Sequence, residues 1–279
     1  MPATFTVPDH IRQVLRDATV FIPDKPSPAN LHTLKLNGQL DRKVYMDVMK
    51  VIDGAGGKWD KKKGLHTFRD DPTVWINQAI DDGKGRNIQQ EFQSFYTPAH
   101  VAAKMVELAR IREGVDQRVL EPSCGEGAIV RAIHRASKTA HITAYDINDV
   151  ALKKCGLGAL GGGMGGPKPA AEIETGYCVL KDFLEVSPPH PEKLYDVCLA
   201  NPPFSGGQDA RHVMHMLDFM KSGGVVVAIL SANAREKTTG PYRSLLFRCD
   251  YTITYSELLP SGTFQDTAVE TLLLRFEKL

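Results

Sequence analysis

From residue 97 onward, segments with the apolar pattern of β-strands alternate with segments that have the pattern of α-helices. The expected strands lie at 118–121, 141–147, 177–180, 195–200 and 224–230, and the expected helices at 127–136, 149–155 and 210–220. A chain that alternates in this way forms a parallel sheet with helices on both faces. This feature restricts the chain more than any other, and it predicts an α/β fold, doubly wound around a mostly parallel sheet.

The two ends of the chain depart from this alternation. No helical pattern separates 251–259 from 269–276, so we expect these two strands to pair antiparallel at the edge of the sheet. Thr97-Pro98 predicts the start of a helix before the first strand, with a hydroxyl N-cap followed by proline at the first helical position. Residues 1–90 show two helical patterns and two short strand-like segments around a charged turn. We therefore predict two domains, a small α+β module at 1–90 and a larger domain at 91–279.

The composition narrows the class of protein. No apolar run approaches the roughly 18 residues of a membrane span, and the N-terminus lacks the basic and apolar regions of a secretory signal. Five cysteines without a Cys-x-x-Cys spacing argue against a disulfide framework or a zinc site. We predict a cytoplasmic protein with no metal and no membrane contact, and the oligomeric state does not follow from the sequence.

The first expected strand runs into a glycine turn, Glu121-Pro122-Ser123-Cys124-Gly125-Glu126-Gly127. Open parallel sheets bind ligands at the carboxyl ends of their strands, and Gly125 and Gly127 let the backbone approach a ligand closely. The next two expected strands are followed by the acids of Asp146-Ile147 and Asp182-Phe183. Acids at successive strand ends predict an adenosine-bearing ligand, with its ribose on Asp146, its adenine amine on Asp182 and its ring against Phe183.

Two adenosine cofactors could occupy such a turn. A dinucleotide such as NAD uses a longer Gly-x-Gly-x-x-Gly turn and places its pyrophosphate at the helix N-terminus. Here Glu121 and Glu126 flank the turn, and their charges would repel a pyrophosphate. An amino acid tail that carries a sulfonium group suits an acidic turn better. We therefore expect S-adenosylmethionine as the cofactor, with NAD as the less favoured alternative.

The segment Asn201-Pro202-Pro203-Phe204 follows the fourth expected strand, so it also lies at the carboxyl edge of the sheet. Its two prolines fix the backbone, and the Asn201 side-chain oxygen and the Pro202 carbonyl can both accept hydrogen bonds from one NH2 group. Phe204 offers a face on which a planar ring can stack. The two acceptors would stabilise the charge that develops as an aromatic amine attacks a methyl sulfonium. All four residues are therefore predicted to be catalytic, and a tight turn after a buried strand is the structural alternative.

These motifs together resemble those of the amino DNA methyltransferases, particularly the adenine N6 enzymes. The resemblance covers about residues 95–279 and rests on Phe95-Tyr96-Thr97-Pro98, the glycine turn, Asp146, Asp182-Phe183 and Asn201-Pro202-Pro203-Phe204, which look like motifs X, I, II, III and IV in that order. It implies a seven-stranded, Rossmann-like methyltransferase sheet with Tyr96, Thr97 and Pro98 near the methionine tail. The cofactor-binding residues expected on this basis are Phe95, Tyr96, Thr97, Pro98, Glu121, Pro122, Ser123, Gly125, Gly127, Asp146, Ile147, Asp182, Phe183 and Asn201.

The resemblance implies adenine in DNA as the target. Methylation of an RNA base or of a protein glutamine amide, and a non-catalytic binding module, are the alternatives. The segment 259–264 resembles a late loop that helps to hold the flipped base, and 56–59 resembles a segment found in methyltransferases of phages and mobile elements.

The region between 201 and 224 is too short for the large target-recognition region of site-specific family members. We therefore expect either that residues 1–90 recognise DNA through a basic run or that recognition is minimal. For the basic run itself, an ordinary solvated hairpin edge is the alternative. The candidate residues are Lys58, Lys61, Lys62, Lys63, His66 and Arg69, together with Lys237 and Arg243.

Overall fold

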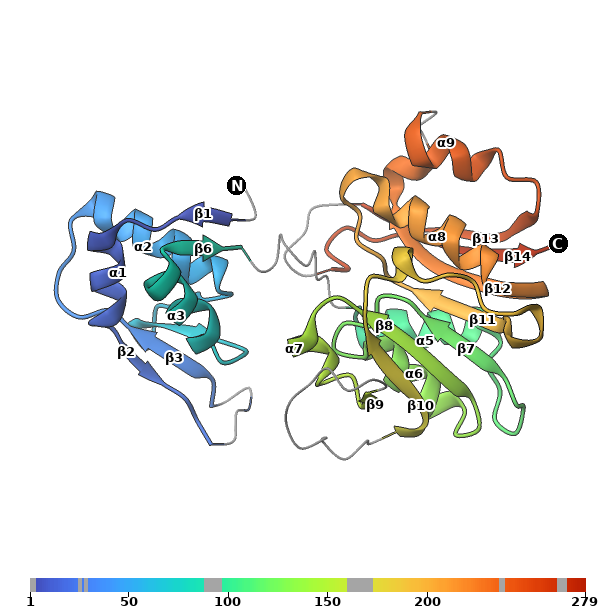
Figure 1. The fold of residues 1–279 in the computed structure, drawn as a ribbon, viewed down its shortest axis with the longest axis horizontal. Helices are drawn as coiled ribbons and strands as arrows, with labels where there is room; N and C mark the ends of the chain where they lie inside the picture. The colour runs from blue at the N-terminus through green and yellow to red at the C-terminus, as the bar shows by residue number, and fades with distance from the viewer. Residues whose placement is uncertain are drawn as a thin grey trace. The chain divides into compact units, whose positions relative to one another are not determined.

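The computed structural model describes residues 4–24, 27, 30–87, 97–159, 173–235, 239–264 and 270–279. The chain forms two compact units, Met1–Gln93 and Ser94–Leu279, coloured blue to blue-green and green to red (Figure 1). Each unit has its own hydrophobic core. Across the described residues, no helix has both the length and the apolar character needed to cross a membrane.

The N-terminal unit is built on a four-stranded antiparallel sheet with the strand order β2-β3-β5-β4, and a separate antiparallel pair joins β1 to β6. Its elements are β1 (Thr4–Thr6), α1 (Asp9–Arg16), β2 (Thr19–Phe21), β3 (His32–Lys35), α2 (Arg42–Gly54), β4 (Lys58–Asp60), β5 (Leu65–Phe68), α3 (Thr73–Asp82) and β6 (Lys84–Arg86). Ile11, Val48 and Ile76, one from each helix, pack with Leu34 and Phe68 of the sheet. The helices and the sheet therefore share one core.

The C-terminal unit is built on one eight-stranded sheet with the order β13-β14-β12-β11-β7-β8-β10-β9. Its strands are β7 (Arg118–Glu121), β8 (His141–Asp146), β9 (Leu157–Ala159), β10 (Ile173–Leu180), β11 (Tyr195–Ala200), β12 (Met220–Ser231), β13 (Tyr251–Leu259) and β14 (Thr271–Lys278). Six of these strands are parallel, while β14 is antiparallel to both β12 and β13. The predicted parallel sheet with an antiparallel edge is thus confirmed.

Helices cover both faces of this sheet. The α-helices are α5 (Ala99–Ala109), α6 (Ala128–Ala136), α7 (Asp149–Leu152), α8 (Gln208–Asp218) and α9 (Gly240–Leu246), and the short 3-10 helices are η1 (Phe183–Glu185), η2 (Pro191–Lys193), η3 (Ser205–Gly207) and η4 (Ala232–Arg235). Val225 and Val227 of β12 belong to the core formed with α5 and α6, whereas Val226 and Ala228 belong to the core formed with α8 and α9. Alternate residues of a strand point to opposite faces, which explains the continuous apolar run and confirms the doubly wound arrangement.

Three local features differ from the sequence-based expectations. The sheet has eight strands rather than seven because the three-residue β9 pairs with the edge of β10. The β12 strand begins at Met220 instead of 224, and α7 has only four residues. Helix α5 begins at Ala99 with Pro98 in the N-cap position and no side-chain cap, so the predicted capping role of Thr97 is wrong. The Thr97 hydroxyl oxygen instead accepts a hydrogen bond from the Asn201 amide.

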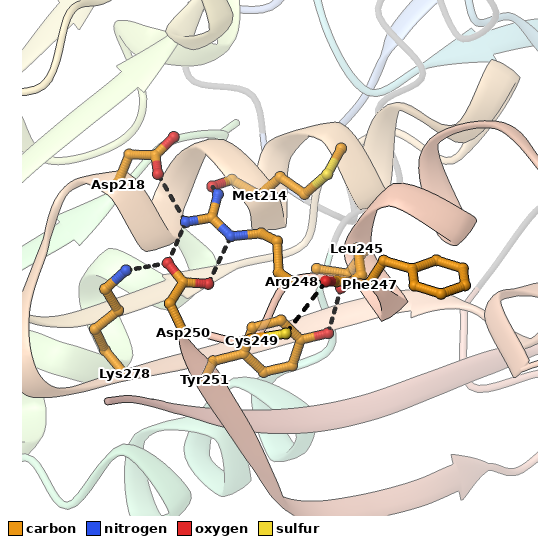
Figure 2. A network of polar contacts seen from close by, with 9 residues as sticks. All are labelled: Met214, Asp218, Leu245, Phe247, Arg248, Cys249, Asp250, Tyr251 and Lys278. Carbon is orange, nitrogen blue, oxygen red and sulfur yellow. Dashed lines mark hydrogen bonds and ion pairs between the residues drawn. The ribbon is translucent and has the colours of Figure 1, made fainter.

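A polar network fixes the end of the sheet where β13 begins (Figure 2). The Arg248 guanidinium donates to Asp218 at 2.8 Å, to the Met214 carbonyl at 2.9 Å and to Asp250 at 2.8 Å, and Lys278 of β14 also binds Asp250. These contacts hold the pKa of the Asp250 carboxyl below its usual range, with the Arg248 hydrogen bond as the main cause. The network joins the end of α8 to β13 and β14, at the sheet edge opposite the carboxyl ends of the parallel strands.

Candidate functional site

The chain reverses direction across the sheet between β7 and β11. From β7 it continues to β8 and β10 on one side, and β11 and β12 lie on the other side (Figure 1). Ligands of open α/β sheets bind in the crevice outside the carboxyl ends of the strands at such a point. Because Val119 pairs with Val197 and Leu120 with Cys198, the two strands end side by side. The glycine turn and the Asn201–Phe204 segment therefore leave neighbouring strands at one edge, which confirms their predicted placement.

The glycine turn is held by the acid of the next strand. The Asp146 carboxylate accepts hydrogen bonds from the Gly125 N–H at 2.6 Å and from the Asn148 N–H at 2.8 Å, so one side chain fixes two loops. Gly125 and Gly127 both have left-handed backbone, with φ of 49° and 81°. A Cβ at Gly127 would collide with the Cys155 backbone, whereas a Cβ at Gly125 would meet nothing within 4 Å. Gly127 is therefore required by packing, and Gly125 is the glycine that borders open space.

Glu121, at the end of β7, is fully buried. One carboxyl oxygen accepts the Ser123 N–H at 3.3 Å, and the other has no hydrogen-bond partner within the described part of the chain. Burial raises the pKa of this carboxyl well above its usual range, and the charge of Asp146 raises it further. A buried acceptor of this kind is costly unless a donor satisfies it. It is a fitting contact for the ammonium group of an amino acid tail.

The other flanking acid, Glu126, has a different role. It is 6% exposed and forms an ion pair with Lys154 at 3.2 Å. Its charge is therefore largely offset within the protein by the Lys154 ammonium. The pairing with Lys154 weakens the sequence-based argument that the charge of Glu126 repels a pyrophosphate.

The third acid caps a short helix, and its neighbour faces the core. Asp182 accepts the Leu184 N–H at 2.9 Å at the start of η1. Phe183 is 1% exposed, and its ring lies 4.8 Å from the Phe219 ring and 5.7 Å from the Tyr145 ring. The expected contact between Phe183 and an adenine ring is corrected, because its faces are already covered. Ile147, which is 52% exposed next to Asp146, is an exposed apolar side chain at this edge.

The Asn201 amide contacts a residue that lies 104 positions earlier in the chain. Its Nδ2 donates to the Thr97 hydroxyl oxygen at 3.2 Å, and Thr97 itself is buried. Pro202 is buried, while Pro203 and Phe204 are half-buried, with Phe204 packed against the core that contains α5 and α6. The segments that resemble motifs X and IV are thus in direct contact. Phe95 and Tyr96 lie outside the described residues.

A buried acid holds the segment that follows Phe204, and sequence reasoning missed it. Asp209 is fully buried and accepts hydrogen bonds from the Ser231 N–H at 2.9 Å and the Tyr242 hydroxyl at 2.8 Å. Burial raises the pKa of the Asp209 carboxyl. These contacts tie the start of α8 to the end of β12 and to α9. In the sequence Asp209 resembles an ordinary acid in the first turn of a helix, so no local signal separates it.

The remaining candidates have modest roles. In the late loop, Leu259 and Phe264 are buried in the core, and the Thr263 N–H donates to the Pro260 carbonyl at 3.1 Å, so the exposed tip between them is anchored at both ends. Arg243 lies over the Phe247 ring at 5.1 Å, and Lys237 is outside the described residues.

Within the described ranges, no group of His, Cys, Asp and Glu side chains is arranged to hold a metal ion. All five cysteines are free thiols.

Comparisons with known proteins agree with this architecture. No protein-family model matches the chain. It is 23% identical over 173 residues to the rRNA N(6)-adenosine-methyltransferase metl-5 of Caenorhabditis elegans, which covers 60% of this chain and 76% of that protein. It is 29% identical over 114 residues to ribosomal RNA small subunit methyltransferase C of Shewanella loihica, which covers 39% of this chain but only 29% of that enzyme.

Two solved structures have a similar backbone. The methyltransferase subunit of a type I restriction-modification system from Streptococcus thermophilus superposes with a TM-score of 0.53 at 19% identity, over 69% of this chain and 47% of that one. The C-terminal unit has a methyltransferase fold. A modification subunit of a putative type I restriction enzyme from Vibrio vulnificus gives a TM-score of 0.54 at 14% identity, over 87% of this chain and 55% of that one. The chain therefore spans about half the length of these subunits.

Proposed function

We propose that the protein transfers a methyl group from S-adenosylmethionine to the exocyclic N6 amine of adenine in DNA. The observation that carries this proposal is the position of Asn201, which starts the turn after β11, beside the glycine turn of β7, and whose amide is bound to Thr97 at 3.2 Å. An amine-binding segment and a turn suited to an amino acid tail lie at one sheet edge, as transfer between two ligands requires.

The residues of the Asn201 segment would prepare the amine for attack. The Nδ2 end of the Asn201 amide faces Thr97, and the oxygen at the opposite end of the amide would accept a hydrogen bond from a substrate amine. That oxygen and the Pro202 carbonyl would accept both N–H groups of the amine and stabilise its developing positive charge. Phe204 would stack on the base. In duplex DNA the base must first leave the helix, at a cost of a few kcal/mol.

The opposite side of the crevice fits S-adenosylmethionine, which supplies the electrophilic methyl group. Asp146 would accept the ribose hydroxyls, because a carboxylate has about four lone-pair sites and two are taken by backbone N–H groups. Asp182 would bind the adenine amine, and Ile147 would contact the ring. The buried Glu121 oxygen, to which none of the described residues donates a hydrogen bond, would accept the ammonium group. Thr97, Pro98 and the adjoining Phe95 and Tyr96 would border the methionine tail.

Transfer of a tritiated methyl group to unmethylated DNA, followed by nucleoside analysis, tests the proposal. We expect N6-methyladenine from the wild-type protein and none from Asn201→Ala, while the mutant still binds S-adenosylmethionine. Absence of transfer to DNA by the wild-type protein, with the cofactor bound, would reject the DNA reaction. Tight cofactor binding without transfer to DNA, RNA or protein would instead indicate a non-catalytic binding module.

A second candidate keeps the chemistry and changes the polymer. The similar C. elegans protein is named as an rRNA N(6)-adenosine methyltransferase, and the same Asn201 segment could hold adenosine in RNA. We favour DNA because the Phe95–Pro98 segment resembles the DNA enzymes. RNA and DNA of the same sequence, offered in one assay, separate the two. The five free thiols are compatible with the reducing cytoplasm in which either substrate would be met.

A further inference from the structure

The N-terminal unit carries a hairpin whose surface the methyl-transfer site does not use. Strands β4 and β5 pair with Trp59 opposite His66, and the turn between them contains Lys61, Lys62 and Lys63. We propose that this hairpin, residues 58–68, is a DNA-binding element in which the three lysines contact phosphates and Trp59 stacks on an unpaired base. The choice of DNA rests on the proposed function.

The turn of the hairpin presents three cations together. The Asp60 carboxylate accepts the Lys62 N–H at 2.9 Å and the Lys63 N–H at 3.1 Å, so the only acid of the turn is engaged by the backbone. All three lysine residues are exposed, and the ion pairs found within the described ranges include none of them. Adjacent lysines that form no ion pair with a described acid suit a phosphate backbone, because their binding releases the counterions of the phosphates.

Trp59 adds an aromatic surface next to these charges. Its side chain is 54% exposed, and one side of the ring lies 4.9 Å from the His66 ring. His66 is buried, and this burial lowers its pKa, so a neutral imidazole supports the indole. The exposed part of the indole remains available to a base. Lysines combined with a supported aromatic ring are the features by which proteins bind single-stranded nucleic acid.

The hairpin is fixed to the core before any ligand binds. Gly56 has a left-handed φ of 85° two residues after the end of α2. A Cβ at Gly57 would lie 2.8 Å from the Phe68 ring and would also collide with Ile52, so only glycine lets β4 begin this close to the core. The Thr67 hydroxyl also donates to the Lys58 carbonyl at 3.2 Å. An element ordered in advance loses little entropy on binding.

Two variants of the full-length chain separate the two contacts. Lys61→Gln/Lys62→Gln/Lys63→Gln removes the charges, and Trp59→Ala removes the ring. The matched controls are Lys43→Gln/Lys84→Gln/Lys193→Gln, which changes three exposed lysines elsewhere, and Phe21→Ala, which removes a 55% exposed ring from β2 at the opposite sheet edge. Affinity for a labelled, unmethylated single-stranded DNA is measured by fluorescence anisotropy over a range of salt concentrations, without cofactor.

We expect the triple lysine variant to reduce the slope of log affinity against log salt by about 2, since each phosphate contact contributes about 0.7. Trp59→Ala should weaken binding about 5- to 100-fold with an unchanged slope, and Trp59→Phe should recover most of the loss. Both controls should bind like the wild type. Because the chain has two tryptophans, a Trp75→Phe background lets the fluorescence of Trp59 report directly, and DNA should quench it.

Wild-type affinity and slope in both hairpin variants would overturn the inference, as would binding to RNA but not to DNA. These outcomes are independent of the methyl-transfer assay. Methylation of DNA with hairpin-independent binding would refute the hairpin proposal alone, whereas hairpin-dependent DNA binding without methyl transfer would refute the proposed reaction alone.

Discussion

The hydrogen bond between Asn201 and Thr97 leads to the sharpest prediction. Thr97→Val keeps the shape of the side chain and removes the Thr97 acceptor for the Asn201 amide, so the amide loses a contact that orients it. The Asn201 side-chain oxygen would then point toward the substrate amine for a smaller fraction of the time. We expect methyl transfer to slow while cofactor and DNA still bind.

The size of the effect follows from the burial of the pair. Thr97 is buried and Asn201 is half-buried, so a donor left without its acceptor costs about 1–2 kcal/mol. If this cost falls on the arrangement needed for attack, the maximal rate drops about 5- to 30-fold, because about 1.4 kcal/mol corresponds to a factor of ten. Thr97→Ser restores a hydroxyl and should recover most of the rate.

Single-turnover methyl transfer at saturating S-adenosylmethionine and DNA measures this rate, and calorimetry measures cofactor affinity. The resemblance to amino DNA methyltransferases implies another role for Thr97, at the methionine tail. In that case Thr97→Val would weaken cofactor binding and leave the saturated rate unchanged. A wild-type single-turnover rate for the valine variant would therefore refute the positioning role.

Further substitutions test the glycine turn and its buried acid. Gly127→Ala should lower the free energy of unfolding by about 3 kcal/mol in urea titrations, since its Cβ would collide with Cys155 at a left-handed φ of 81°. Gly125→Ala should cost only about 1–2 kcal/mol of stability, for its left-handed backbone, yet weaken S-adenosylmethionine binding. Because burial raises the pKa of Glu121 above its ordinary 4.5, the folded protein binds this proton more tightly than the unfolded chain does. The free energy of unfolding of the wild type without cofactor should therefore fall as the pH rises from about 4.5 through the raised pKa. Glu121→Gln should lack this fall. Identical profiles of stability against pH for the wild type and the variant would contradict the prediction.

The fold of the C-terminal unit was predictable because its signals are local and repeated. Residues 225–230 are all apolar, which is the pattern of a strand buried on both faces. In the structure, alternate residues of this strand pack in two different cores. The carboxyl-edge placement of Asp146 and Asn201 followed from the rule for parallel strands. The short β9 strand was not predictable, because three residues at a sheet edge carry no periodicity.

The directions and partners of individual side chains were less predictable from the sequence. Phe183 follows an acid at a strand end, and the sequence cannot tell whether its ring faces the crevice or the core. Its burial against Phe219 depends on residues of another element. The same holds for Thr97, whose partner lies 104 residues away in the chain. The Thr-Pro pattern predicts a helix cap from the local sequence alone. In the structure the Thr97 hydroxyl makes a tertiary hydrogen bond with Asn201 and does not cap the helix.

The acids at the crevice also hold the backbone of neighbouring loops, which their residue type alone does not reveal. Asp146 binds the N–H groups of Gly125 and Asn148, and Asp182 binds that of Leu184. Each carboxylate therefore shapes a loop before any cofactor is present, while its remaining lone pairs can still accept ribose or adenine donors. An acceptor oriented in this way loses no rotamer freedom when the ligand binds. Loss of either acid would thus change the shape of the edge as well as its charge, so a weakened affinity in such variants cannot be assigned to the lost ligand contact alone.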